Sequence, residues 1–426
     1  MLALRVLLKG KILIGGRVRE REVLAEDGWI VKIGKRLNEE ADLTLELGKR
    51  ELAVPAPIDL HVHCRDPHPD YPFGFKTETR RFLLGGVATV VDMPNTRPAP
   101  TTPETYYEKE ELARENAEIE VIVAGGVRDS QCTKELVEAG AYVLGEVFLA
   151  TSTDAPAVPW STLPEIFREL SPDGPLTIFH PELDELVAER PARNLYEHLK
   201  NRPPEAETTA VGLLAGLKVR YPSRIHLSHV TLPESVKIAK GADITVDVTP
   251  HHLFFDVLRV DPEDPVFKVN PPLRGRHHRL GLLRAVRRGD VDVLASDHAP
   301  HILEDEFEDV PSGVTGGEII LPAALTLHRR FGLSLRDAVA MITCRPAKLL
   351  GRDDLGEVAV GKRARITVVR MREFVVRAEE FGEEDRKFPY DGMRMFGEPV
   401  KLIDGTKVYD LKESRREGKP VILEGE

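Results

Sequence analysis

Two histidines stand one residue apart at the end of an apolar run, in the stretch IDLHVHCRD at positions 58–66. Side chains two residues apart on a strand point to the same side, so His61 and His63 can approach one ion together. Neutral imidazoles are common ligands of Zn²⁺ and related divalent metals. A His-x-His pattern also occurs by chance, so the pair predicts a metal centre only if further ligands join it.

Three further candidate ligands each follow an apolar run much later in the chain. His180 ends the run LTIFH, His229 follows RIHLS, and Asp297 follows VDVLAS. Taken singly, His180 could be a structural histidine and Asp297 a turn residue or a helix cap. If these runs are parallel strands of one barrel, however, their C-terminal ends meet on one face. The joint pattern of four histidines and one aspartate then predicts a metal centre.

The runs that would position these residues have the pattern of a (β/α)8 barrel. Eight apolar runs alternate with helical patterns such as those at 103–117 and 205–222. Most runs are continuous Val/Ile/Leu stretches without polar alternation, which is typical of parallel strands covered on both faces. We therefore predict an α/β fold with a TIM barrel over residues 54–345.

The two ends of the chain have a different character. Residues 1–53 and 346–426 contain short β-like runs, and the DGT sequence at 404–406 is a good hairpin turn. We predict that these two segments together form one small, β-sandwich-like domain beside the barrel.

Composition narrows the class of protein further. A net charge of −11 argues against nucleic acid or an anionic membrane as the main partner, although a local basic pocket can still bind a small anion. Three cysteines without CxxC spacing suit a reducing cytoplasm, and no apolar run approaches the roughly 18 residues of a membrane span. A single glutamine and six asparagines beside abundant charge suggest a thermophile. We expect a cytoplasmic enzyme.

Seven short motifs give the chain a resemblance to dihydroorotases of the amidohydrolase superfamily. They are PIDLHVHCRDP, VVDMPNTRPAP, FHPE, HLSHVT, PHHL, KVNPPLR and ASDHAPH, in the same order as in that family. The resemblance covers nearly the whole chain, and MPNT and DHAPH are its most specific parts. It implies a hydrolase of cyclic amides that interconverts N-carbamoyl-L-aspartate and L-dihydroorotate in pyrimidine (UMP) biosynthesis.

The resemblance also implies the composition of the metal centre, with zinc as the metal and two ions per chain. His61, His63 and Asp297 would hold the first ion, and His180 and His229 the second. Asp297 would act as general acid and base for water activated at the metals.

The resemblance further implies how the substrate is bound. Arg65 would grip the substrate carboxylate with its two-pronged guanidinium group, helped by Asn95 and His301. Asn270 would contact the ring amide or the ureido group. Arg65 could instead form a surface ion pair, Asn95 could stabilise a turn, and His301 could be an ordinary loop residue.

The pattern departs from the family at the fourth strand. Many dihydroorotases bridge their two metals there with a carbamylated lysine, whereas VLGEVF at 143–148 has Glu146 in its place. Glu146 either bridges two metals directly, or lies beside a single metal, or is unrelated to the site. We favour the bridge, because His180 and His229 are both kept as ligands for a second ion.

Two further functions are compatible with the same motifs. A hydantoinase or allantoinase would share the barrel and the metal ligands, but would have less use for Arg65, Asn95 and His301. Loss of the lysine also suits an inactive subunit that scaffolds aspartate transcarbamoylase. The chain could therefore associate with aspartate transcarbamoylase, and it could also form a homodimer. Both associations can be tested.

Overall fold

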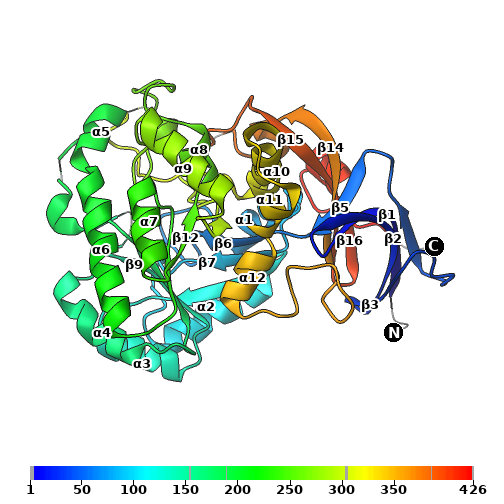
Figure 1. The fold of residues 1–426 in the computed structure, drawn as a ribbon, viewed down its shortest axis with the longest axis horizontal. Helices are drawn as coiled ribbons and strands as arrows, with labels where there is room; N and C mark the ends of the chain where they lie inside the picture. Colours follow the sequence, from blue (N-terminus) through cyan, green and yellow to red (C-terminus); the bar gives the residue numbers. More distant parts are fainter. Residues whose placement is uncertain (1–3, 153–154, 189, 303–305, 385, 425–426) are drawn as a thin grey trace.

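The computed structural model describes residues 4–152, 155–188, 190–302, 306–384 and 386–424. In these residues the chain forms a barrel of strands and helices, with a separate mixed sheet at one side of it (Figure 1). Among the described residues, no helix has the length and apolar character needed to cross a membrane.

Eight parallel strands form the barrel, and each lies within one of the eight apolar runs of the sequence. Neighbouring strands pair in chain order from first to last. The ring closes where Val62 forms a parallel bridge with His298 and the His63 amide donates to the His298 carbonyl at 2.7 Å. The predicted (β/α)8 barrel is therefore confirmed. The strands are β6 (Ile58–Val62), β7 (Thr89–Asp92), β8 (Glu120–Gly125), β9 (Val143–Phe148), β10 (Leu176–His180), β11 (Ile225–Leu227), β12 (Thr245–Val248) and β13 (Val293–Leu294).

Helices cover the outside of the barrel (Figure 1), and a last short helix follows the final strand of the second sheet. Helix α2 shows why they begin where they do: the Thr102 side chain accepts from the Thr105 amide, and Pro103 occupies the first helical position. The α-helices are α1 (Phe75–Leu84), α2 (Pro103–Asn116), α3 (Ser130–Glu138), α4 (Leu163–Glu169), α5 (Leu195–Asn201), α6 (Pro204–Arg220), α7 (Pro233–Gly241), α8 (Pro250–Phe254), α9 (Arg276–Arg288), α10 (Ile320–Phe331), α11 (Leu335–Ala340), α12 (Cys344–Leu350) and α13 (Leu411–Glu417). Short 3₁₀ turns are found at Trp160–Thr162, Asp184–Leu186, Pro265–Phe267, Gly317–Ile319 and Ala378–Glu380.

The second sheet joins the two ends of the chain. Strand β5 runs antiparallel to β14, with Pro55 opposite Ile366, so residues far apart in sequence share one ladder. The sheet is mixed because β4 and β5 run parallel to β1. Its strands are β1 (Arg5–Ile14), β2 (Arg17–Glu26), β3 (Trp29–Gly34), β4 (Leu43–Glu46), β5 (Glu51–Pro55), β14 (Arg365–Val375), β15 (Arg394–Asp404) and β16 (Lys407–Asp410).

The burial of the barrel strands explains both their sequence and the location of the site. Every residue of β6, β9 and β10 is buried, so these strands have no solvent face on which polar residues could alternate. Leu60, Val143 and Ile178, one from each of these strands, belong to a single apolar cluster. Polar side chains therefore gather at the C-terminal strand ends, where a barrel of this kind carries its active site.

Candidate active site

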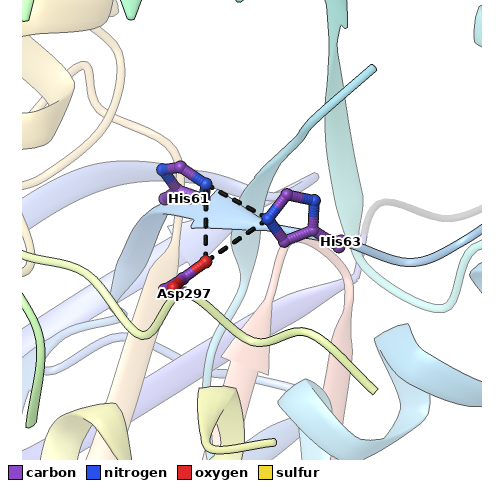
Figure 2. Close-up of side chains that lie close together, drawn as sticks. All are labelled: His61, His63 and Asp297. Carbon is purple, nitrogen blue, oxygen red and sulfur yellow. Dashed lines mark hydrogen bonds and ion pairs between the residues drawn. The ribbon is translucent and has the colours of Figure 1, made fainter. Parts of the chain in front are cut away.

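Three of the candidate ligands form a compact triangle at the mouth of the barrel. His61 on β6, His63 just after it and Asp297 just after β13 point toward one another (Figure 2). The two Nε2 atoms are 3.3 Å apart, and Asp297 Oδ1 lies 3.3 Å from His63 Nε2 and 3.6 Å from His61 Nε2. Ligands held about 2.0–2.1 Å from a tetrahedral ion are themselves about 3.3 Å apart. The spacing and the donor types therefore fit a divalent metal ion.

Glu146 lies between this triangle and two further histidines. Its Oε2 is 3.3 Å from His61 Nε2, and its Oε1 is 2.6 Å from His229 Nε2 and 3.2 Å from His180 Nδ1. His61, Glu146 and His229 bring ligand atoms close enough to form a second metal-binding group, and His180 adjoins it through Glu146. The two oxygens of one short carboxylate thus face two different sets of ligands.

A β-bulge brings Glu146 into this position. Along the β9–β10 ladder Leu144 pairs with Thr177 and Val147 with Phe179, so two residues of β9 stand opposite Ile178 alone. The extra residue is Gly145, whose φ of 101° lies in the region that favours glycine. A Cβ at Gly145 would come within 2.1 Å of the Ile178 carbonyl oxygen, so a larger residue would not fit. The bulge redirects the strand at the point where a short carboxylate must reach the centre of the barrel.

The electrostatics of the cluster favour positive charge at its centre. Burial disfavours a charged His61, but the charge and hydrogen bond of Glu146 and the charge of Asp297 outweigh it and raise the pKa of His61 to about 10. Burial likewise opposes ionisation of Glu146, yet its histidine neighbours hold its pKa well below the usual range. The pKa of Asp297 is also lowered, against burial, by its bond with His63 and by nearby histidine charges. The pKa of His63 is instead lowered, mainly by its burial. Glu146 and Asp297 thus place two carboxylate groups among the histidines, and carboxylate and imidazole groups are ligands that divalent metals favour.

His180 is oriented by a carboxylate that sequence reasoning did not single out. Glu182 is fully buried, and its Oε2 lies 3.0 Å from His180 Nε2 and 2.9 Å from Arg202 Nε. A proton held on Nε2 leaves the Nδ1 lone pair directed toward Glu146. Histidine ligands of metals are commonly fixed in this way by a second carboxylate. The available signal was the position of Glu182 in the FHPE motif, two residues after His180.

Three buried aspartates fix the backbone at the site, and the sequence did not reveal them either. Arg65, His229 and Asp297 have φ values of 59°, 38° and 51°, which cost energy for residues other than glycine. In each case an aspartate on a barrel strand accepts from the amide of that residue or of the one before it. The bonds are Asp92 Oδ1 with Cys64 N at 2.6 Å, Asp247 Oδ1 with His229 N at 2.6 Å, and Asp59 Oδ1 with Ser296 N at 3.0 Å.

The predicted substrate-binding residues lie beside the ligand cluster. Arg65, Asn95 and Asn270 line the same small cavity as Glu146 and Asp297. Arg65 is buried, and its Nη2 lies 3.1 Å from Nε2 of His301, which is buried behind it. The structure therefore brings Arg65, Asn95 and Asn270 to the cavity beside the cluster and places His301 in contact with Arg65. Phe148, Ser152, Ser312 and Gly313 also line the cavity and carried no recognisable signal in the sequence.

Asn95 and Asn270 each have a contact within the protein. Asn95 Oδ1 lies 2.6 Å from His63 Nδ1, so a proton held there leaves His63 Nε2 free to face Asp297. Asn270 donates through Nδ2 to the Ser152 hydroxyl at 3.3 Å. Asn95 is therefore tied to a candidate metal ligand as well as to the predicted carboxylate pocket.

Comparison with protein-family models identifies the class of enzyme to which the fold and site belong. Residues 207–391 match the amidohydrolase family, and residues 50–155 match the dihydro-orotase-like family. Among solved structures, an L-hydantoinase from Arthrobacter aurescens matches with a TM-score of 0.87 at 24% identity, covering 99% of this chain and 98% of its own. A D-hydantoinase from Bacillus sp. AR9 also has a TM-score of 0.87, at 22% identity and with 99% and 97% coverage. The protein is an amidohydrolase, a hydrolase acting on cyclic amides, with the barrel fold of these enzymes.

Relatives of known sequence narrow the class to one family. A dihydroorotase of Methanosarcina acetivorans is 32% identical over 97% of this chain and 94% of its own length. A dihydroorotase of Halobacterium salinarum is 30% identical, with 95% and 96% coverage, and one of Ligilactobacillus salivarius is 27% identical, with 95% and 98%. The chain belongs to the dihydroorotase family.

Proposed function

We propose that this chain interconverts L-dihydroorotate and N-carbamoyl-L-aspartate at a centre of two zinc ions. The observation that carries the proposal is the position of Arg65 and His301 beside the ligand cluster, with Arg65 lining the same cavity. A buried guanidinium group provides a binding site for a carboxylate, which dihydroorotate has and hydantoin and allantoin lack. The cavity thus combines a reaction centre with a site for the anionic end of the substrate.

The residues of this chain would hold the two ions as follows. His61, His63 and Asp297 would bind one ion, and His180 and His229 the other. Glu146 would help to hold both ions, in the role of the carbamylated lysine of other dihydroorotases. When bound, such ions lower the pKa of water and polarise a carbonyl group.

Asp297 would move the proton that the reaction requires. In ring opening its carboxylate takes a proton from the attacking water, the C–N bond of the ring amide breaks, and the same proton passes to the leaving nitrogen. In ring closure the ureido nitrogen gives a proton to Asp297 as its C–N bond to the carbon of the protonated carboxyl group forms, and Asp297 returns this proton to the departing hydroxide, which leaves as water. The bond with His63 and the nearby histidine charges lower the pKa of Asp297 despite its burial, so Asp297 begins ring opening as a carboxylate and readily returns the proton to the leaving nitrogen.

The other polar residues would position the substrate relative to the metal ions. Arg65 would bind the carboxylate through two parallel hydrogen bonds, with His301 behind it. Asn95 would keep the ring of His63 in position and border the carboxylate, and Asn270 would read the ring amide across the cavity.

Turnover tests the proposal directly. The purified protein is expected to convert L-dihydroorotate and N-carbamoyl-L-aspartate into each other, with little activity on hydantoin or allantoin. Removal of metal with a chelator should abolish activity, and zinc should restore it, because the proposed reaction depends on the bound ions as electrophiles. Faster turnover of hydantoin or allantoin than of dihydroorotate would favour those activities. Absence of any turnover after zinc is added would support an inactive scaffold subunit.

Substitution of Arg65 tests whether its side chain binds the carboxylate of the substrate. Hydrogen bonds to charged groups contribute about 1.5–3 kcal/mol, so Arg65→Met should raise the KM for dihydroorotate about 10- to 100-fold. Steady-state kinetics measures this KM. The KM of Arg65→Lys should fall between those of the wild type and Arg65→Met, because lysine keeps the charge but cannot form two parallel hydrogen bonds. Arg97→Met is the matched control, since Arg97 lies in the same motif region as Asn95 but pairs with Asp70 at the surface. An unchanged KM in Arg65→Met would contradict the assignment.

A further inference from the structure

Lys387 is a fully buried lysine whose side chain bonds to neutral groups. It lies in the connection between β14 and β15 and is 0% exposed. Its Nζ donates to the carbonyl oxygens of Lys268 and Pro311, each at 2.8 Å. Burial and the nearby charge of Lys268 lower its pKa well below the usual range. Burying a lysine is costly, so an apolar residue would fill this position more cheaply unless the two bonds matter.

The two acceptor carbonyls belong to the loops that form the substrate side of the cavity. Lys268 stands two residues before Asn270, and Pro311 directly precedes Ser312, which lines the cavity with Gly313. The Lys268 carbonyl also accepts from the Gly313 amide at 3.0 Å. Lys387 therefore joins loops that lie more than forty residues apart in the sequence.

The main chain of Lys387 reinforces the same junction. Its carbonyl accepts from the Thr315 amide at 2.9 Å, so the loop at 311–315 is held at both ends by one residue. Gly313, inside that loop, packs tightly against the proposed carboxylate pocket. A Cβ at Gly313 would lie 2.9 Å from both His301 Cδ2 and Ala299 Cβ. A small displacement of the loop would therefore press on His301 or leave it unsupported.

We propose that Lys387 is a positioning residue that holds the loops at 268–270 and 311–313 together. By fixing these loops, it sets the shape of the part of the cavity that binds the non-reacting end of the substrate. This inference rests on the proposed function, in which Asn270 and His301 contact a small anionic cyclic amide. The residue comes from the connection that links two strands of the second sheet. The connection between β14 and β15 therefore reaches the catalytic face of the barrel.

The kinetic test compares Lys387→Met with two other variants. Methionine is unbranched and one atom shorter than lysine, so it nearly fills the same space but has no donors. KM for dihydroorotate should therefore rise about tenfold with kcat changed less than about threefold, the signature of lost binding. Lys387→Arg, which retains donors, should recover part of the loss. Lys218→Met is the control, because Lys218 also donates to a loop carbonyl, that of Ser223 at 2.6 Å, but near the start of β11 at the other end of the barrel.

Amide hydrogen exchange tests whether Lys387 holds the two loops together, independently of enzymatic activity. In Lys387→Met, with or without substrate, exchange at the Gly313 and Thr315 amides should accelerate, while exchange in the β1–β2 hairpin stays unchanged. If Lys387→Met does not fold, Lys387→Gln, which keeps an N–H donor one atom shorter, gives the same two measurements. A lower melting temperature with unchanged KM and unchanged loop exchange would overturn the inference. If the wild type has no dihydroorotate activity but loop exchange is still faster in Lys387→Met than in the wild type, the result would support the clamp and contradict the proposed function instead.

Discussion

Glu146→Ala is expected to bind one metal equivalent per chain or none, compared with two for the wild type, and to lose at least about a thousandfold in dihydroorotate turnover. The reason is geometric: Glu146 is the residue whose two oxygens face both ligand sets, at 3.3 Å from His61 and 2.6 Å from His229. Without it, each ion loses an anionic ligand, and the four buried histidines lose the negative charge that they surround. Elemental analysis of protein purified without chelator measures the stoichiometry, and the same samples give the activity.

Two further variants at position 146 sharpen this result. Glu146→Gln keeps the shape but not the charge, and should also lose metal if the carboxylate is the bridge. Glu146→Lys should remain inactive even with added bicarbonate. A carbamylated lysine extends three atoms beyond the glutamate carboxyl carbon, and the bulge at Gly145 already brings Glu146 into contact with its partners. Two metals retained in Glu146→Ala would exclude the bridge, and one metal in both proteins would indicate a single-ion site.

The barrel could be predicted from the sequence because its strands leave a local signal. Strands such as β7 and β10 are buried throughout, so they appear as mainly apolar runs that end in a polar residue, Asp92 and His180 respectively. The convergence of His61, His180 and Asp297 then followed from the rule that parallel strand ends share one face. Neither step needed knowledge of side-chain contacts.

The details that set the site's geometry left no such signal. The bulge at Gly145 depends on the register of β9 against β10, which is a property of two strands and not of either sequence alone. Asp92 and Asp247 lie within runs that looked apolar, and their roles arise from amides on neighbouring strands. Lys387 stands more than seventy residues from both carbonyls that it binds. Such long-range polar contacts become visible only once the fold has brought the segments together.

Asp297→Asn should lower kcat for dihydroorotate by at least about a thousandfold, since general acid–base catalysis contributes about 10²- to 10⁴-fold and the substitution removes a metal ligand's charge as well. The amide keeps the shape of the side chain but cannot accept the proton of water. Steady-state kinetics in both directions measures the effect, and both should fall together because one group moves the same proton each way.

Metal analysis of Asp297→Asn then separates the two roles of the residue. A variant that keeps two metal equivalents but loses kcat would place the defect in proton transfer, whereas parallel loss of metal would place it in ligation. Asp292→Asn is the matched control, because Asp292 lies at the opposite end of β13 and accepts from the Val246 amide at 2.9 Å. That variant should retain full activity. A kcat for Asp297→Asn within about tenfold of wild type would rule out the proton-transfer role, since removal of a general base costs more than that.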